Sequence, residues 1–121
     1  MENNTTATLL RIYVSSTDKF KHTPLNEMIV YRAKKHNLAG VTVVKGILGY
    51  GASSVIHSYK FWEVSEKVPT VIEIVDEEEK IFSFYEEIKP FLEKMRYGCL
   101  VTLEKVNVLL YKAGEKHLFG S

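Results

Sequence analysis

The sequence lacks the features that mark several protein classes. It has a single cysteine, Cys99, which excludes an intramolecular disulfide and a zinc site built on a cysteine cluster. No run of about 18 apolar residues occurs, and the N-terminus has no basic start followed by an apolar stretch. We therefore expect a cytoplasmic protein that works in a reducing compartment.

An excess of charge of one sign is also missing. The 16 basic and 15 acidic residues give a formal net charge of +1, so no global field attracts nucleic acid or an anionic membrane. We expect no nucleic-acid partner, and an anion site must be local. The 121 residues, of which 45% are hydrophobic, suit one domain with one core. Residues 1–121 are thus treated as a single domain, with residues 1–7 and 112–121 as flexible tails.

Apolar residues that alternate with polar ones predict four strands. The strands are expected over residues 8–14, 41–48, 70–75 and 100–111. A bulge is expected near residues 104–105, where the alternation changes phase. A hairpin arm over residues 55–64 should follow the second strand.

Apolar residues at three- and four-residue spacing predict two helices. The first covers residues 24–36, because Thr23 can cap a helix and Pro24 suits its first position. The second follows Asp76, a further candidate cap, and carries an apolar stripe from Ile81 to Met95. Pro90 should kink or divide this helix, because proline removes a backbone hydrogen bond.

The order of elements predicts an α+β fold. It is a ferredoxin-like β-α-β-β-α-β sandwich, in which a four-stranded antiparallel sheet carries two helices on one face and an extra hairpin or loop follows strand two. The opposite face should carry Arg11, Tyr13, Thr42, Val44 and Glu73. Tyr13 and Val44 are apolar for a face that meets water, which favours burial against further copies of the chain.

Long stretches of the chain resemble one family. Residues 40–51 and 71–75 are similar to the second and third strands of the PII nitrogen-regulatory signalling proteins, and more so to an uncharacterised PII-like family. The resemblance extends from about residue 10 to residue 111. Its other matching stretches are residues 10–13, 18–19, 24–25, 38–40, 52–54 and His57.

The resemblance implies a homotrimer with clefts between subunits. In PII proteins each cleft binds ATP or ADP, so the expected effector is a small anion, with an adenine nucleotide as the candidate. Residues 52–66 would form the mobile loop that engages a membrane transporter, an enzyme or a regulatory protein. The candidate ligand-binding residues are Lys45, Gly46, Gly49, Tyr50, Gly51, Asp18, Lys19, His57, Lys94 and Arg96.

Simpler interpretations of these residues stay open. The glycines can serve a sharp turn alone, the charges on the loop after strand one can be merely solvated, and Lys94 and Arg96 also suit the end of a helix. The chain further departs from PII proteins in having Val108 and Leu110 where they place two phosphate-binding arginines late in strand four. A triphosphate would therefore lose charge-assisted hydrogen bonds there.

Three functions are compatible with this pattern. The leading one is a non-enzymatic regulatory trimer that binds an anionic effector and signals through its loop. The second is a protein-interaction module without a small ligand, and the third is a trimeric metal-binding protein that uses some of the scattered histidines His22, His36, His57 and His117. An enzyme comes last, because no nucleophile–base pair or pair of carboxylates stands out.

Overall fold

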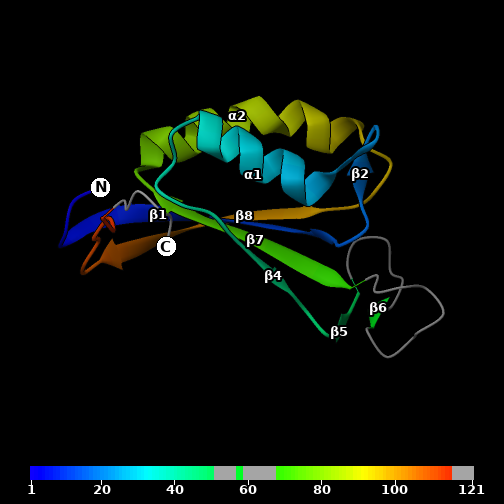
Figure 1. The fold of residues 1–121 in the computed structure, drawn as a ribbon, viewed down its shortest axis with the longest axis horizontal. Helices are drawn as coiled ribbons and strands as arrows, with labels where there is room; N and C mark the ends of the chain where they lie inside the picture. Colours follow the sequence, from blue (N-terminus) through cyan, green and yellow to red (C-terminus); the bar gives the residue numbers. More distant parts are fainter. Residues whose placement is uncertain (51–56, 59–67, 116–121) are drawn as a thin grey trace.

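The computed structural model describes residues 1–50, 57–58 and 68–115. Its main elements are the four strands of one sheet and two helices, and short strand pairs lie in the connections (Figure 1). In chain order they are β1 (Thr5–Ser15), β2 (Lys19–Phe20), β3 (Thr23–Pro24), α1 (Leu25–Lys35), β4 (Thr42–Lys45), β5 (Leu48–Gly49), β6 (His57–Ser58), β7 (Pro69–Asp76), α2 (Glu78–Lys94) and β8 (Leu100–Val108).

The predicted ferredoxin-like sandwich is confirmed. The four-stranded sheet has the order β4-β7-β1-β8, and all three neighbouring pairs are antiparallel. Both helices lie on the same face of the sheet (Figure 1). Two small two-stranded sheets, β2 with β3 and β5 with β6, accompany this body.

The core fills the space between the sheet and the helices. Alternate residues of β1 and β7 point towards the helices, and each helix buries one stripe of side chains. The buried cluster consists of Leu10, Ile12, Val14, Leu25, Met28, Ile29, Ala33, Ile72, Ile74, Ile81, Phe84, Ile88 and Leu92. Burial of one such large side chain contributes roughly 1.5–3 kcal/mol, so this cluster is what holds the two layers together.

The predictions for the first and the last strand in the sequence need correction. β1 begins at Thr5, and Ala7 is only 2% exposed, so residues 5–7 belong to the sheet and not to a tail. β8 ends at Val108, earlier than predicted. The predicted bulge is wrong, because Glu104 pairs with Leu9 and Lys105 with Thr8 in one unbroken register. β8 is an edge strand with mostly exposed side chains, so burial does not impose a clean alternation on its sequence.

The second predicted strand is shorter and broken. β4 ends at Lys45, and β5 begins only at Leu48. Gly46 and Ile47 separate them, and the N–H of Gly46 donates to the carbonyl oxygen of Pro69 at 2.6 Å. Of the hairpin arm predicted over residues 55–64, only residues 57–58 are described, and they form β6.

The helix boundaries also differ in detail. Pro24 is the N-cap of α1 rather than its first residue, and no side chain caps this helix. Thr23 pairs with Phe20 instead, in the β2–β3 ladder. The helix α2 runs without a break through Pro90. Pro90 lies on the exposed side, where water can satisfy the carbonyl that a missing N–H leaves free.

Asp76 holds the end of β7 in place and is not the N-cap of α2, which has no side-chain capping hydrogen bond. Its side chain is 2% exposed. One carboxylate oxygen accepts the N–H of Ala39 at 2.7 Å, and the other accepts the N–H of Glu77, the N-cap residue, also at 2.7 Å. The aspartate thus ties the connection after α1 to the start of α2.

The face without helices carries the predicted residues in two rows. Thr42, Glu73 and Arg11 are register partners across three strands, and so are Val44, Val71 and Tyr13. Arg11 binds the carboxylates of Glu73 at 2.9 Å and Glu104 at 2.6 Å. The apolar row continues into Leu100 of β8, which pairs with Tyr13 and is 55% exposed. This surface, which we call the open face, thus combines apolar side chains with one ion cluster.

Candidate functional site

The candidate site residues gather at one end of the sheet. There, β1 and β4 end while β7 and β8 begin, as the pairing of Tyr13 with both Val71 and Leu100 requires. The loop after β1, the segment after β4 and the turn before β8 therefore meet at this end (Figure 1). Lys19 lies in the first of these segments and Arg96 in the third, and Lys45 is the last residue of β4, so antiparallel topology brings together residues that are far apart in the sequence.

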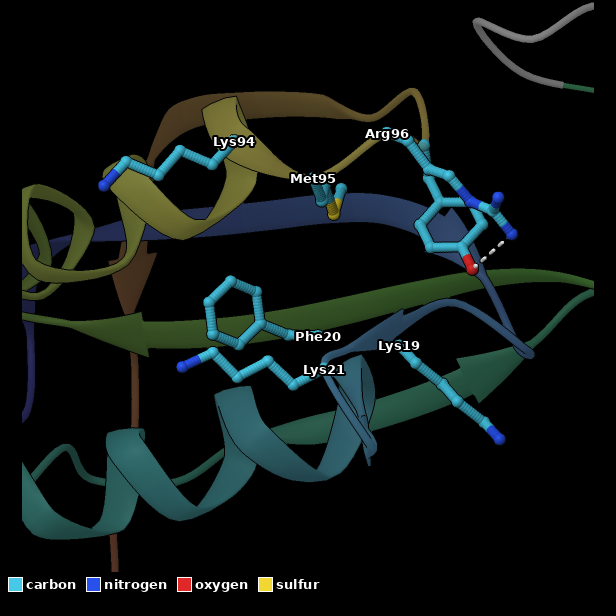
Figure 2. A pocket seen from close by; sticks show the side chains of 7 residues that line it. Lys19, Phe20, Lys21, Lys94, Met95 and Arg96 are labelled. Carbon is cyan, nitrogen blue, oxygen red and sulfur yellow. Dashed lines mark hydrogen bonds between the residues drawn. The ribbon is translucent and has the colours of Figure 1, made fainter.

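An open pocket of about 450 Å³ lies between two of these segments. One wall is β2 with the turn that follows it, and the other is the end of α2 with the turn that follows it (Figure 2). The predicted residues Lys19, Lys94 and Arg96 all line it. The pocket adds four residues that the sequence did not single out: Phe20, Lys21, Met95 and Tyr97.

Each wall of the pocket contains a cation, an apolar residue and a second cation in succession, and Tyr97 follows the second of these triplets. The triplets are Lys19-Phe20-Lys21 and Lys94-Met95-Arg96. In both, the central residue packs against the core and the flanking cations are exposed. This repeated pattern is the signal that could have found Lys21 in the sequence, since an apolar residue between two cations anchors both of them at one surface.

The central residues of the two triplets, Phe20 and Met95, make specific contacts with α2. The Phe20 ring meets the Phe91 ring edge-on, with 4.9 Å between the centroids. The backbone N–H of Met95 donates to the carbonyl oxygen of Phe91 at 3.2 Å. Lys21 has a φ of 59°, a left-handed conformation that non-glycine residues rarely adopt and that reverses the chain towards β3. Both walls are therefore fixed to the same residue of α2.

The electrostatics of the pocket favour an anion. Among the described residues that line it, none is acidic. Lys21 Nζ lies 5.6 Å from the centre of the Phe20 ring, and Arg96 Cζ lies 5.1 Å from that of Tyr97. Aromatic faces attract cations without neutralising them. The positive charges of the pocket thus remain available to a negatively charged ligand.

The other predicted residues lie outside this pocket lining. Lys45 and Tyr50 are exposed at the same end of the sheet. A Cβ at Gly46 would come within 3.3 Å of the Pro69 carbonyl oxygen, and one at Gly49 within 3.2 Å of Pro69 Cγ, so a side chain at either position would crowd Pro69. Gly51 lies outside the described residues, and of His57 only the backbone in β6 is described.

Asp18 organises the loop after β1. It is 3% exposed, its carboxylate accepts the N–H of Ser15 at 2.9 Å, and its carbonyl accepts the N–H of Leu25 at 2.9 Å. Burial, and to a smaller extent the charge of Asp18, raise the pKa of the Cys99 thiol. Cys99 is therefore kept protonated, as expected for an unreactive thiol.

A surface contact between the helices also involves side chains of the kinds that occur in catalytic sites. His36 Nδ1 lies 3.2 Å from Glu87 Oε1, and its Nε2 lies 3.1 Å from Ser83 Oγ. Arg32 donates to the other oxygen of Glu87 at 3.1 Å. The contact joins α1 to α2 on exposed positions, and the residues that line the pocket do not take part in it. We interpret it as a tie between the helices.

The described residues also bear on two other classes of site. No group of three or more histidine, cysteine, aspartate or glutamate side chains in that part of the chain is arranged to hold a metal ion. No described helix combines the length and apolar character needed to cross a bilayer.

Comparison with known structures places the fold among PII-like proteins. The chain is similar to CPII, a nitrogen regulatory PII-like protein from Thiomonas intermedia K12 solved with ADP, AMP and bicarbonate. The TM-score is 0.67 at 17% identity, over 88% of this chain and 91% of that one. A putative PII-like signalling protein from Thermus thermophilus matches with a TM-score of 0.59 at 18% identity, over 86% of this chain and 90% of that one. At these identities the likeness shows the fold.

Sequence comparison gives the family. A UPF0166 protein of Aquifex aeolicus (strain VF5) is 41% identical over 101 residues, which cover 84% of this chain and 91% of that protein. A UPF0166 protein of Methanocaldococcus jannaschii is 37% identical, over 62% of this chain and 68% of that protein. The model of the DUF190 family (Uncharacterized ACR, COG1993) matches residues 7–108. The chain therefore belongs to the DUF190 family, an uncharacterised family with a PII-like fold.

Proposed function

We propose that the protein is a non-enzymatic, PII-like regulator that binds a small anionic effector at the end of the sheet where the pocket lies. The observation that carries this proposal is the pocket itself, to which two distant segments contribute four cations and, in the part of the lining that the structure describes, no acidic residue. Clusters of unneutralised cations are unfavourable by mutual repulsion and become favourable when an anion binds. An adenine nucleotide is the first effector to test, because the structurally similar CPII was solved with ADP and AMP.

The proposal includes a homotrimer assembled through the open face. Val44 and Tyr13 lie in one apolar row across the sheet. In the single subunit this row is open to solvent, with Val44 48% exposed and Tyr13 37% exposed. Contiguous apolar surface of this kind is typical of an interface, and closed symmetry buries it in every copy. The effector would then bind where subunits adjoin, with Lys45 and the segment that follows it near the pocket.

Signalling would depend on the loop of residues 52–66, which lies outside the described residues apart from β6. The backbone enters this region at Tyr50 and leaves it before Val68, at the same end of the sheet as the pocket. An effector can change what the loop binds only if it has a higher affinity for one loop state than for another. A membrane transporter or a regulatory protein is the class of partner that fits this mode of action.

Calorimetric titration of the purified protein with ATP, ADP and AMP tests the effector proposal. We expect saturable binding of at least one nucleotide, and a loss of about tenfold in affinity for at least one of Lys94→Ala and Arg96→Ala, because the cation that holds the phosphates would lose its charge-assisted hydrogen bond. Lys34→Ala is the matched control, since Lys34 is an exposed lysine of α1 that does not line the pocket.

The outcomes separate the candidate functions. Binding that both pocket variants leave unchanged would remove the pocket from the effector site. The absence of binding with every nucleotide would favour the ligand-independent interaction module, which should capture the same partner with and without nucleotide. Native mass spectrometry of the same samples reports the number of subunits.

A further inference from the structure

The four cations of the pocket are divided into two pairs. Figure 2 shows the amino groups of Lys21 and Lys94 towards one side of the Phe20 and Met95 side chains, and the charged ends of Lys19 and Arg96 towards the other. Each pair takes one member from each wall. The pairs are thus separated by the apolar residues that anchor the walls.

This division follows from the local backbone. Phe20 and Met95 both pack against the core, so each fixes its own wall to the body of the domain while its two neighbours diverge from it. In β2 the side chains of Lys19 and Phe20 alternate in direction. The left-handed conformation of Lys21 then turns the chain, which directs the second lysine away from the first. The separation of charge is therefore built into the fold of the two walls.

The charges suit two anionic groups better than one. A phosphate monoester carries a charge of about −1.5 to −2 at neutral pH, which two cations balance. A single compact anion at one end would leave the pair at the other end unneutralised. The middle of the pocket, with Phe20 and Met95, offers contact surface to an apolar or flat group. Tyr97 extends this surface at the Arg96 end.

We propose that the pocket binds an elongated ligand with an anionic group at each end and an apolar or flat middle, of which a bisphosphate is the simplest example. The Lys21–Lys94 pair binds one phosphate, and the Lys19–Arg96 pair binds the other. This inference rests on the proposed function, because it gives the chemical class of the effector. It also assigns a binding role to Lys21, and the four cations that it uses all come from one chain.

The test uses synthetic alkanediol bisphosphates with a butyl, hexyl or octyl middle and the alkyl monophosphates of the same lengths. Calorimetric titration of the wild-type protein should show at least one bisphosphate binding about tenfold or more tightly than its monophosphate, because the second contact becomes intramolecular. Bisphosphates of all three lengths that bind no more tightly than the monophosphates would overturn the proposal.

Variants at each end test the pairing. Lys21→Ala and Lys19→Ala should each reduce the affinity of the preferred bisphosphate to about that of the monophosphate, whereas Lys34→Ala should leave it unchanged. All three lysines are exposed, and circular dichroism of each variant confirms its fold. A bisphosphate affinity that is insensitive to either pocket variant would contradict the assignment of two ends.

Titration with ADP separates this inference from the proposed function. ADP has its phosphates at one end only, so it needs one pair of cations. If ADP binds, and weakens with Arg96→Ala but not with Lys21→Ala, and bisphosphates show no advantage, the effector site stands and the two-ended ligand is wrong. If neither ADP nor any phosphate probe binds, both proposals fail.

Discussion

Phe20 and Phe91 meet edge-on, with 4.9 Å between their ring centroids, and this contact joins the pocket to the helical layer. The Phe91 ring also contacts Arg32, whose guanidinium carbon lies 4.3 Å from the ring centre. Phe20 is the residue between Lys19 and Lys21. A single aromatic pair therefore determines where two of the four pocket cations are placed.

Removal of the Phe20 ring should weaken both the fold and anion binding. Phe20→Ala deletes a partly buried ring and an aromatic pair, which we expect to lower the free energy of unfolding by about 2 kcal/mol. It also frees both lysines of the hairpin, so the affinity for the effector should fall about tenfold or more. Urea unfolding and calorimetric titration measure the two effects.

Phe20→Leu is the matched control for this variant. Leucine retains an apolar anchor of similar volume but loses the edge-on contact, so stability and affinity should both lie between those of the wild type and Phe20→Ala. Equal affinity of all three proteins would show that the ring does not position the lysines.

Asp76 is expected to contribute strongly to stability through backbone contacts alone. Its buried carboxylate accepts the N–H groups of Ala39 and Glu77, both at 2.7 Å. Asp76→Ala leaves both donors without this acceptor, at a cost of roughly 2–4 kcal/mol. Thermal and urea denaturation measure it. Asp76→Asn retains one acceptor oxygen and should cost about half as much, while equal costs for the two variants would contradict this account.

The sheet topology could be predicted from the sequence because its inner strands are constrained by burial. In β7, Thr70, Ile72 and Ile74 are nearly inaccessible and alternate with half-buried residues, so the pattern in the sequence matches the pattern in the fold. β8 is an edge strand on which this constraint is weak, and there the sequence suggested a bulge that does not exist. The alternation of apolar and polar residues is therefore informative for inner strands, which have another strand on each side.

The site could be predicted only in part for a different reason. Lys19, Lys94 and Arg96 were found through the family resemblance, and these three line one pocket. Lys21 was missed, because its cation–apolar–cation pattern does not match the family's motifs and its direction depends on a left-handed backbone conformation. The role of Asp76 was misassigned because its partner Ala39 lies 37 positions away, which no local pattern reveals.

A charge on the open face should prevent assembly. Leu100 lies in the apolar row of this face, opposite Tyr13, and is 55% exposed in the subunit. Leu100→Glu would bury a carboxylate in the proposed interface, which is costly without a partner charge. We expect the protein to shift from a trimer to a monomer in native mass spectrometry.

Leu103 provides the control for this substitution. It lies on the same strand and is 42% exposed, but it pairs with Leu10 and so belongs to the face that carries the helices. Leu103→Glu should leave the number of subunits unchanged. A trimer that survives Leu100→Glu, or a monomer in both variants, would contradict assembly through the open face.

The Cys99 thiol should make stability decrease in mildly alkaline solution. Burial raises its pKa above the ordinary value of a cysteine thiol, and the nearby charge of Asp18 adds to this effect. A group with a raised pKa in the folded state binds its proton more tightly than in the unfolded chain. Its contribution to stability is therefore complete below the pKa of the unfolded thiol, and is lost as the pH rises through the folded one.

Cys99→Ser should remove this part of the pH dependence. The free energy of unfolding of the wild type, measured by urea at several pH values, should decline from about pH 8.5 upwards, and the variant should decline less. Alkylation by iodoacetamide provides a second measure, because only the thiolate reacts. The folded protein should react more slowly than the urea-unfolded chain at the same pH, and equal rates would show that the thiol is neither buried nor shifted.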